Sequence, residues 1–325
     1  MITKVFQENG MADRPILSII IPTYQREDLL MQCLRSIFTA EKPPLGFEVF
    51  VVDDGGGLSR EIEIGFPGDD IRWVRLPKNC GQANAQEIGR RQAKGEILAF
   101  LDDDCIVGKA WLGEIERFFA THPQLACMTG RVEAQDTSHI LARTRQEIYY
   151  ERARRIAGEG FQAALRAKWT LPECPGVLLS DHLSGGNFAI RRETLEAIGG
   201  FDQSVQFGND RVMSQRLLGE ACAIAYDPAL VIYHKHDIQY RTIYRIAKRK
   251  MERHFSGGLE IHLRECLPLF LELLRAPFDI RRHPEMYRAD PSRIKVYLAF
   301  TCVQVLYALG GLLTFFPMYF TKVLR

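Results

Sequence analysis

The sequence has no paired cysteine motif, little net charge and no apolar stretch at its N-terminus. Its eight cysteines are scattered through 325 residues without a CxxC pair, which excludes a zinc ribbon and a disulfide framework and predicts reduced thiols. A net charge of +2 does not indicate a basic surface, so no nucleic-acid partner is expected. The first fifteen residues lack the apolar region of a signal peptide, which favours the cytoplasm.

One long segment lacks charged residues altogether. Residues 296–320 contain no charged side chain over 25 positions, enough for a helix to cross a bilayer. Arg293 and Lys295 precede the segment and Lys322 follows it, as basic residues do at membrane interfaces. Two glycines and a proline interrupt it, so two shorter pieces lying in the membrane plane are an alternative to a span. Either arrangement predicts membrane association.

Composition divides the chain into four segments. Residues 1–15 are an N-terminal extension, and residues 16–239 have the composition of a globular α/β domain. Residues 240–293 alternate basic and apolar side chains, which is typical of a solvated helix or of a helix on anionic lipid. Residues 294–325 form the hydrophobic segment. This order predicts a protein at the cytoplasmic face of a membrane, held there by its last segment.

Short apolar runs that alternate with helical patterns indicate an α/β fold with a mostly parallel sheet flanked by helices. The runs at 16–24, 47–54 and 96–104 end in the polar stretches "PTY", "VVDD" and "FLDDD", and a further strand is expected at 71–77. Ligands bind outside the carboxyl ends of parallel strands. The three polar stretches are therefore expected to converge on one edge of the sheet.

The triplet Asp102, Asp103 and Asp104 is the most unusual of these stretches. Three adjacent carboxylates repel one another unless water, a cation or hydrogen-bond donors compensate them. One interpretation is an acidic, solvated turn after a buried strand. The other is a site for a hard divalent cation that holds a phosphate. The convergence of the strand ends favours the second.

Five motifs in a fixed order carry a resemblance to a known family. They are "SIIIPTY", "FEVFVVDDGG", "NCGQANAQEIGRRQAKGEILAFLDDD", "GGNFAIRRETLEAIGGFD" and "NDRVMSQRL". With them the chain resembles family 2 glycosyltransferases, inverting enzymes with the GT-A fold, from Ile16 to His236. The resemblance implies a GT-A fold and transfer of a sugar from a nucleotide-diphosphate donor.

The resemblance implies a divalent metal, Mn²⁺ or Mg²⁺, at the acid triplet. Asp102 and Asp104 match the DxD motif of the family, with Asp104 as the direct ligand, although Asp103 could substitute in an unbroken triplet. Asp102 and Asp103 would also contact the nucleotide. His234 stands where some relatives supply a further ligand, and a surface histidine is the alternative. The metal would neutralise charge on the leaving diphosphate.

The resemblance also implies a nucleotide pocket and a catalytic base. Residues of the first two strand ends would bind the base of the nucleotide, with UDP favoured: Pro22, Thr23, Tyr24, Asp53 and Asp54. An aspartate that only caps the glycine-rich turn is the alternative for the acidic pair. Asp210 matches the base that deprotonates the acceptor hydroxyl, although a plain helix cap is the alternative.

The chain departs from the family pattern at two places near this site. Asn209 replaces the glutamate that usually precedes the base, which puts acceptor handling in doubt. Gln86 stands where a basic contact to the diphosphate is common. The resemblance places Gly185, Gly186 and Asn187 in the loop under the donor sugar and the acceptor.

Three functions are compatible with these residues. The favoured one is an inverting glycosyltransferase that acts on a lipid-linked, polysaccharide or glycoconjugate precursor at a membrane. A phosphatase of the haloacid dehalogenase type also carries DxD, but its nucleophile follows the first strand rather than the fourth. A degenerate glycosyltransferase that binds nucleotide as an assembly partner is the non-enzymatic alternative, motivated by Asn209 and Gln86.

Overall fold

The structure is a computed structural model that describes residues 17–42, 46–68, 70–138, 140–205 and 208–235. The chain divides into two compact units. The described part of the first, residues up to 135 together with residues from 149 onward, contains the sheet and the site discussed below. The described part of the second comprises residues 136–138 and 140–148, a short loop and the first turns of helix α6.

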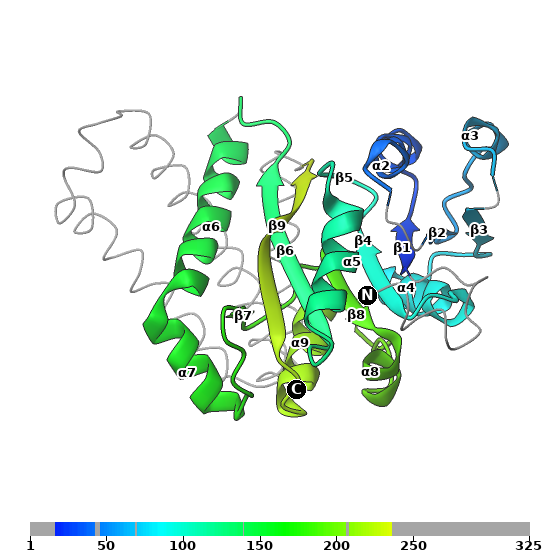
Figure 1. Cartoon of the computed structure of the whole chain (residues 1–325). Helices are drawn as coiled ribbons and strands as arrows, with labels where there is room; N and C mark the ends of the chain where they lie inside the picture. The colour runs from blue at the N-terminus through cyan, green and yellow to red at the C-terminus, as the bar shows by residue number, and fades with distance from the viewer. Residues whose placement is uncertain (1–16, 43–45, 69, 139, 206–207, 236–325) are drawn as a thin grey trace, which may run out of the picture. The chain divides into compact units, whose positions relative to one another are not determined.

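A single mixed sheet organises the described residues (Figure 1). Its strands run in the order β3-β2-β1-β4-β8-β6-β9-β5, and β7 pairs with β9 beside this path. The bounds are β1 Leu17–Thr23, β2 Phe47–Asp53, β3 Ile71–Arg75, β4 Ile97–Leu101, β5 Cys105–Val107, β6 Cys127–Ala134, β7 Leu178–Ser180, β8 Asn187–Arg191 and β9 Ile224–His234.

The first four strands confirm the parallel arrangement expected from the sequence. β3, β2, β1 and β4 are parallel, and Thr23 lies opposite Asp53 at the shared carboxyl edge. The rest of the sheet is mixed: β8 runs antiparallel to β4 and β6, and β5 and β7 run antiparallel to β9. A buried apolar run indicates a strand but not its direction, so the second half could not be read from the pattern.

Helices cover the sheet where their small or apolar faces allow close packing. Helix α4 packs against β1 and β2, and a Cβ on its Gly89 would lie 2.7 Å from Ile20 Cγ2. This glycine therefore sets how closely helix and sheet approach. The helices are α2 Glu27–Thr39, α3 Arg60–Gly65, α4 Gln82–Gln92, α5 Trp111–Thr121, α6 Ile140–Ala157, α7 Glu159–Trp169, α8 Arg192–Ala197 and α9 Asn209–Gly219.

No helix in the described part of the chain is long and apolar enough to cross a membrane. The segments expected at 240–293 and 294–325 lie outside the described residues, as does the extension at 1–15. The described cysteines are all free thiols: Cys33, Cys80, Cys105, Cys127, Cys174 and Cys222.

A buried carboxylate ties α4 to the turn that follows α8. Glu87 is 2% exposed and accepts hydrogen bonds from Arg90, Arg91 and the backbone N–H of Phe201. A Cβ on Gly200 would lie 2.6 Å from Glu87 Oε2, so only glycine fits beside it. Burial alone would raise the pKa of Glu87, but these hydrogen bonds lower it below its ordinary value of 4.5.

We expect Glu87→Gln to lower the free energy of unfolding by about 2–3 kcal/mol near neutral pH, because Arg90 loses its buried partner. The lowered pKa stabilises the fold fully above pH 4.5 and less as the pH falls through the folded-state pKa. Denaturant titrations of the parent and the variant should therefore converge in acid. The control is Glu196→Gln, which removes an exposed partner of the same arginine and should cost less than about 1 kcal/mol. A gap between parent and Glu87→Gln that does not shrink in acid would contradict this role.

Candidate active site

The acid triplet occupies the turn between β4 and β5, and its three side chains take different partners. Asp103 is buried and accepts a hydrogen bond of 2.7 Å from Thr23 Oγ1. Arg26 Nη1 lies 3.1 Å from Asp103 and 2.9 Å from Asp104. The last residue of β1 and the loop after it thus compensate two of the three charges and hold the turn against the first strand. The prediction that these strand ends converge is confirmed.

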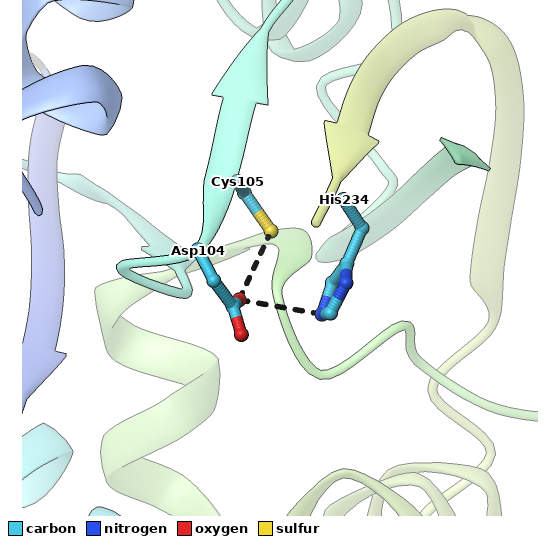
Figure 2. A group of neighbouring side chains, drawn as sticks. All are labelled: Asp104, Cys105 and His234. Carbon is cyan, nitrogen blue, oxygen red and sulfur yellow. Dashed lines mark hydrogen bonds and ion pairs between the residues drawn. The ribbon is translucent and has the colours of Figure 1, made fainter. Parts of the chain in front are cut away.

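Asp104 lies in a cluster of three groups that can hold a metal ion (Figure 2). His234 Nε2 is 3.3 Å from Asp104 Oδ1, and Cys105 Sγ is 3.8 Å from the same oxygen. One ligand atom from each residue lies within 4.8 Å of the others. A carboxylate oxygen and an imidazole nitrogen suit a divalent ion such as Mn²⁺. The residues present therefore fit the expected metal, and His234 lies beside the acid rather than apart on the surface.

Asp102 faces a cavity of about 310 Å³. Its Oδ1 accepts a hydrogen bond of 2.7 Å from Gln82 Nε2, at the first turn of α4. Asp210, at the start of α9, lines the same cavity. The other lining residues include Gln86, Tyr149, Arg152, His182, Ser184, Gly208, Asn209 and His234.

Two glycines pass between Asp102 and Asp210. A Cβ on Gly186 would lie 2.7 Å from Asp102 Oδ2, and a Cβ on Gly185 would lie 3.4 Å from Asp210 Oδ2. A larger residue at Gly186 would therefore displace the Asp102 carboxylate. Both glycines line the cavity, as expected for a loop under the substrates.

Two asparagines near the cavity have structural roles. The amide of Asn187 is fully buried, accepts from Trp111 Nε1, and donates to the carbonyls of Arg131 and Leu230, so it joins β8, β6 and β9. Asn209, with its amide oriented by its neighbours, accepts from Ala83 N–H and donates to Val205 O. Asn209 therefore caps the first turn of α4, which explains an amide where the family carries a glutamate.

The expected nucleotide residues lie together at the edge formed by β1 and β2. Both oxygens of Asp53 accept backbone N–H groups, from Gly56 and Leu58, so this aspartate does cap the glycine-rich turn. Asp54 accepts the N–H groups of Cys80 and Gly81 and fixes the loop before α4. Pro22 is buried near the end of β1, whereas the side chain of Tyr24, just after the strand, is 41% exposed. Carboxylates keep lone pairs beyond two hydrogen bonds, so a role in reading the base remains a prediction.

Arg152 is the main site residue that the motifs did not indicate. It lies on α6, donates to Ser184 Oγ and His182 O, and lines the cavity. Its three hydrogen bonds within the described residues go to neutral oxygens, and its Nε is buried without a partner there. Burial lowers the pKa of this guanidinium. Its only sequence signal was a basic, helix-prone stretch, which does not tell one arginine from another.

The electrostatics of the cavity depend on Asp102. Burial raises its pKa to about 8, and the charges of the other two triplet residues and of Asp210 add to this effect. The metal-free site therefore favours the protonated form of Asp102 more than water does. A cation bound at the triplet would favour the charged form.

Comparison with known proteins decides the family. The model described as "Glycosyl transferase family 2" matches residues 18–199, more than half of the chain. The chain belongs to glycosyltransferase family 2. The expected family is thereby confirmed, and the haloacid dehalogenase interpretation is excluded.

Curated members of family 2 are similar over part of their length. Glycosyltransferase AglE of Haloferax volcanii is 31% identical over 30% of this chain and 33% of its own. The pre-mycofactocin glycosyltransferase of Mycobacterium tuberculosis is 25% identical over 72% of this chain and 45% of its own. The chain thus spans about a third to a half of these relatives.

Solved structures show the same fold. A mannosyltransferase from Pyrobaculum calidifontis, solved with GDP-Man and Mn²⁺, has a TM-score of 0.58 and 19% identity over 92% of this chain and 87% of its own. TarS 1–349 of S. aureus has a TM-score of 0.51 and 17% identity over 90% of this chain and 91% of its own. The GT-A-like architecture expected for family 2 is confirmed.

The raised pKa of Asp102 predicts a pH dependence of stability without metal. A carboxyl whose pKa rises on folding stabilises fully below its unfolded value of 3.8 and progressively less as the pH rises through about 8. Asp102→Asn should therefore raise the free energy of unfolding of the metal-free protein by about 1–3 kcal/mol at pH 8. Denaturant titration in EDTA measures this, with the exposed Glu41→Gln as control. Equal pH profiles for the parent and Asp102→Asn would refute the assignment.

Proposed function

We propose that this protein is a metal-assisted, inverting glycosyltransferase that moves a sugar from a nucleotide-diphosphate donor, with UDP favoured, to an acceptor hydroxyl. The observation that carries the proposal is the placement of Asp102 and Asp210 on the wall of one cavity, with Gly185 and Gly186 between them. Asp104 and His234 lie 3.3 Å apart beside the same turn, where they could hold a metal ion. The donor and the acceptor would therefore bind in the same cavity.

Asp104 and His234 would hold the divalent ion, Mn²⁺ or Mg²⁺, as two of its protein ligands. When bound, the ion supplies a Lewis acid that neutralises charge on the leaving diphosphate. Thr23 and Arg26 keep the turn in place through Asp103. Arg152 on helix α6 would add a positive charge to the cavity, in place of the basic contact to the diphosphate that is missing at Gln86.

Asp210 would act as the general base. Its carboxylate would take the proton of the acceptor hydroxyl while the oxygen bonds to the anomeric carbon of the donor sugar. The bond from that carbon to the phosphate oxygen would break, and its electron pair would leave with the diphosphate. Attack from the face opposite the leaving group inverts the configuration. Ser214 Oγ, which donates to Asp210 O and accepts from Leu183 N–H, joins this residue to the glycine loop.

The acceptor would be a lipid-linked, polysaccharide or glycoconjugate precursor at the cytoplasmic face of a membrane. The support is the uncharged run at 296–320 and the basic stretch before it, both in the sequence outside the described residues. Such an acceptor would reach Asp210 from a membrane surface.

Asp210→Asn should abolish transfer while leaving donor binding nearly intact, because the amide fills the same volume but cannot take a proton. Loss of a general base costs about 10²- to 10⁴-fold in rate. Donor hydrolysis and transfer are measured by release of the nucleotide, and donor affinity by calorimetry. Asn209→Asp is the neighbouring comparison and should keep activity. Full activity in Asp210→Asn would move the base elsewhere, and no transfer by the parent from any donor would favour the nucleotide-binding partner.

The nucleotide and the metal can be tested together by thermal shift. In Mn²⁺ the parent should be stabilised more by UDP than by ADP, since a ligand that binds the folded state raises its melting temperature. Asp104→Asn should lose most of the Mn²⁺-dependent part of this shift and remain folded. The exposed Asp28→Asn serves as the charge-matched control. A UDP shift that EDTA leaves unchanged would reject the metal site.

A further inference from the structure

The thiol of Cys105 lies within the proposed metal centre. Cys105 begins β5 and is the direct cross-strand partner of His234 on β9. Opposed residues of an antiparallel pair project to the same face, and Figure 2 shows the sulfur and the imidazole both facing one oxygen of the Asp104 carboxylate. The sheet itself therefore places the three side chains together.

The spacing of the three ligand atoms fits a small metal ion. Around a tetrahedral ion with bonds of about 2.0–2.3 Å, neighbouring ligand atoms are about 3.3–3.8 Å apart. Asp104 Oδ1 is 3.3 Å from His234 Nε2 and 3.8 Å from Cys105 Sγ. The remaining pair, sulfur and nitrogen, lies within 4.8 Å. The three ligand atoms thus form one face of a tetrahedron. The fourth coordination position is left for water or a phosphate oxygen.

We propose that Cys105 Sγ is a protein ligand of this centre, and that the centre therefore binds thiophilic divalent ions, Cd²⁺, Zn²⁺ and Co²⁺, more tightly than Mg²⁺ or Mn²⁺. The inference rests on the metal site in the proposed function. Oxygen ligands alone favour hard ions, whereas one thiolate with one imidazole shifts the preference towards soft and borderline ions. On binding, the S–H bond breaks, a sulfur–metal bond forms and the proton passes to solvent.

A second buried thiol in the same region provides a matched control. Cys33 on α2 is fully buried, and its Sγ contacts the backbone carbonyl of Asp102 at 3.7 Å. It is not among the three clustered ligand groups. Replacing either thiol by a hydroxyl changes volume little, so a difference between the two variants reports coordination rather than packing.

Co²⁺ and Cd²⁺ titrations of the full chain test the proposal without any sugar substrate. The parent should show a sulfur-to-metal charge-transfer band in the ultraviolet with both ions, and Cys33→Ser should keep it. Cys105→Ser should lose the band and bind Cd²⁺ at least about tenfold more weakly, while its Mn²⁺ affinity, measured by electron paramagnetic resonance, changes less than about threefold. Circular dichroism verifies that both variants remain folded.

The outcomes separate this inference from the proposed function. An unchanged band in Cys105→Ser, or no band in the parent while Mn²⁺ still binds through Asp104, would overturn the thiol ligand and leave the metal site standing. Absence of binding by every divalent ion would overturn both. Loss of the band in Cys33→Ser but not in Cys105→Ser would show that Cys33 is the sulfur ligand, and would overturn the proposal.

Discussion

Mutual repulsion among the acid triplet and Asp210 is the constraint on which the site depends. Burial is the largest cause that raises the pKa of Asp102 to about 8, and the charges of Asp104, Asp103 and Asp210 oppose its ionisation further. The surrounding elements supply a separate partner for each of the three carboxylates of the triplet. Thr23 at the end of β1 and Arg26 in the loop after it contact Asp103. Gln82 at the start of α4 contacts Asp102, and His234 at the end of β9 contacts Asp104. Three elements, β1 with the loop after it, α4 and β9, thus contribute side chains that keep one acidic turn in place.

The other buried acids near the site fix loops. Asp53, Asp54 and Glu87 accept backbone N–H groups, from turns that have no regular partner of their own. Each fixes a loop, after β2, before α4 and after α8. Buried N–H groups are costly when unpaired, so these carboxylates determine where the loops around the cavity can lie. The site therefore combines acids that fix its loops with acids, Asp102 and Asp210, that line the cavity.

The sequence was sufficient for the parallel strands and the convergence of their polar ends, because these depend on local patterns. Buried β-branched runs predict strands, and a motif order that matches a family predicts the residues at their ends. The direction of β8 and the capping role of Asn209 could not be read, since both depend on contacts with elements far along the chain. Arg152 was missed for the same reason: its helix contains many basic residues, and only the fold shows which one faces the cavity.

The position of β9 has a consequence for how the protein is made. This strand pairs with β5, β6 and β7, and it carries His234 almost at the end of the described chain. The parallel strands β1 to β4 leave the ribosome much earlier, with the acid triplet already at their edge. Until β9 has been synthesised, β5 has no partner and the triplet has no imidazole beside it. A growing chain therefore carries the edge formed by β1 to β4 for more than a hundred residues of translation before Asp104 and His234 can come together.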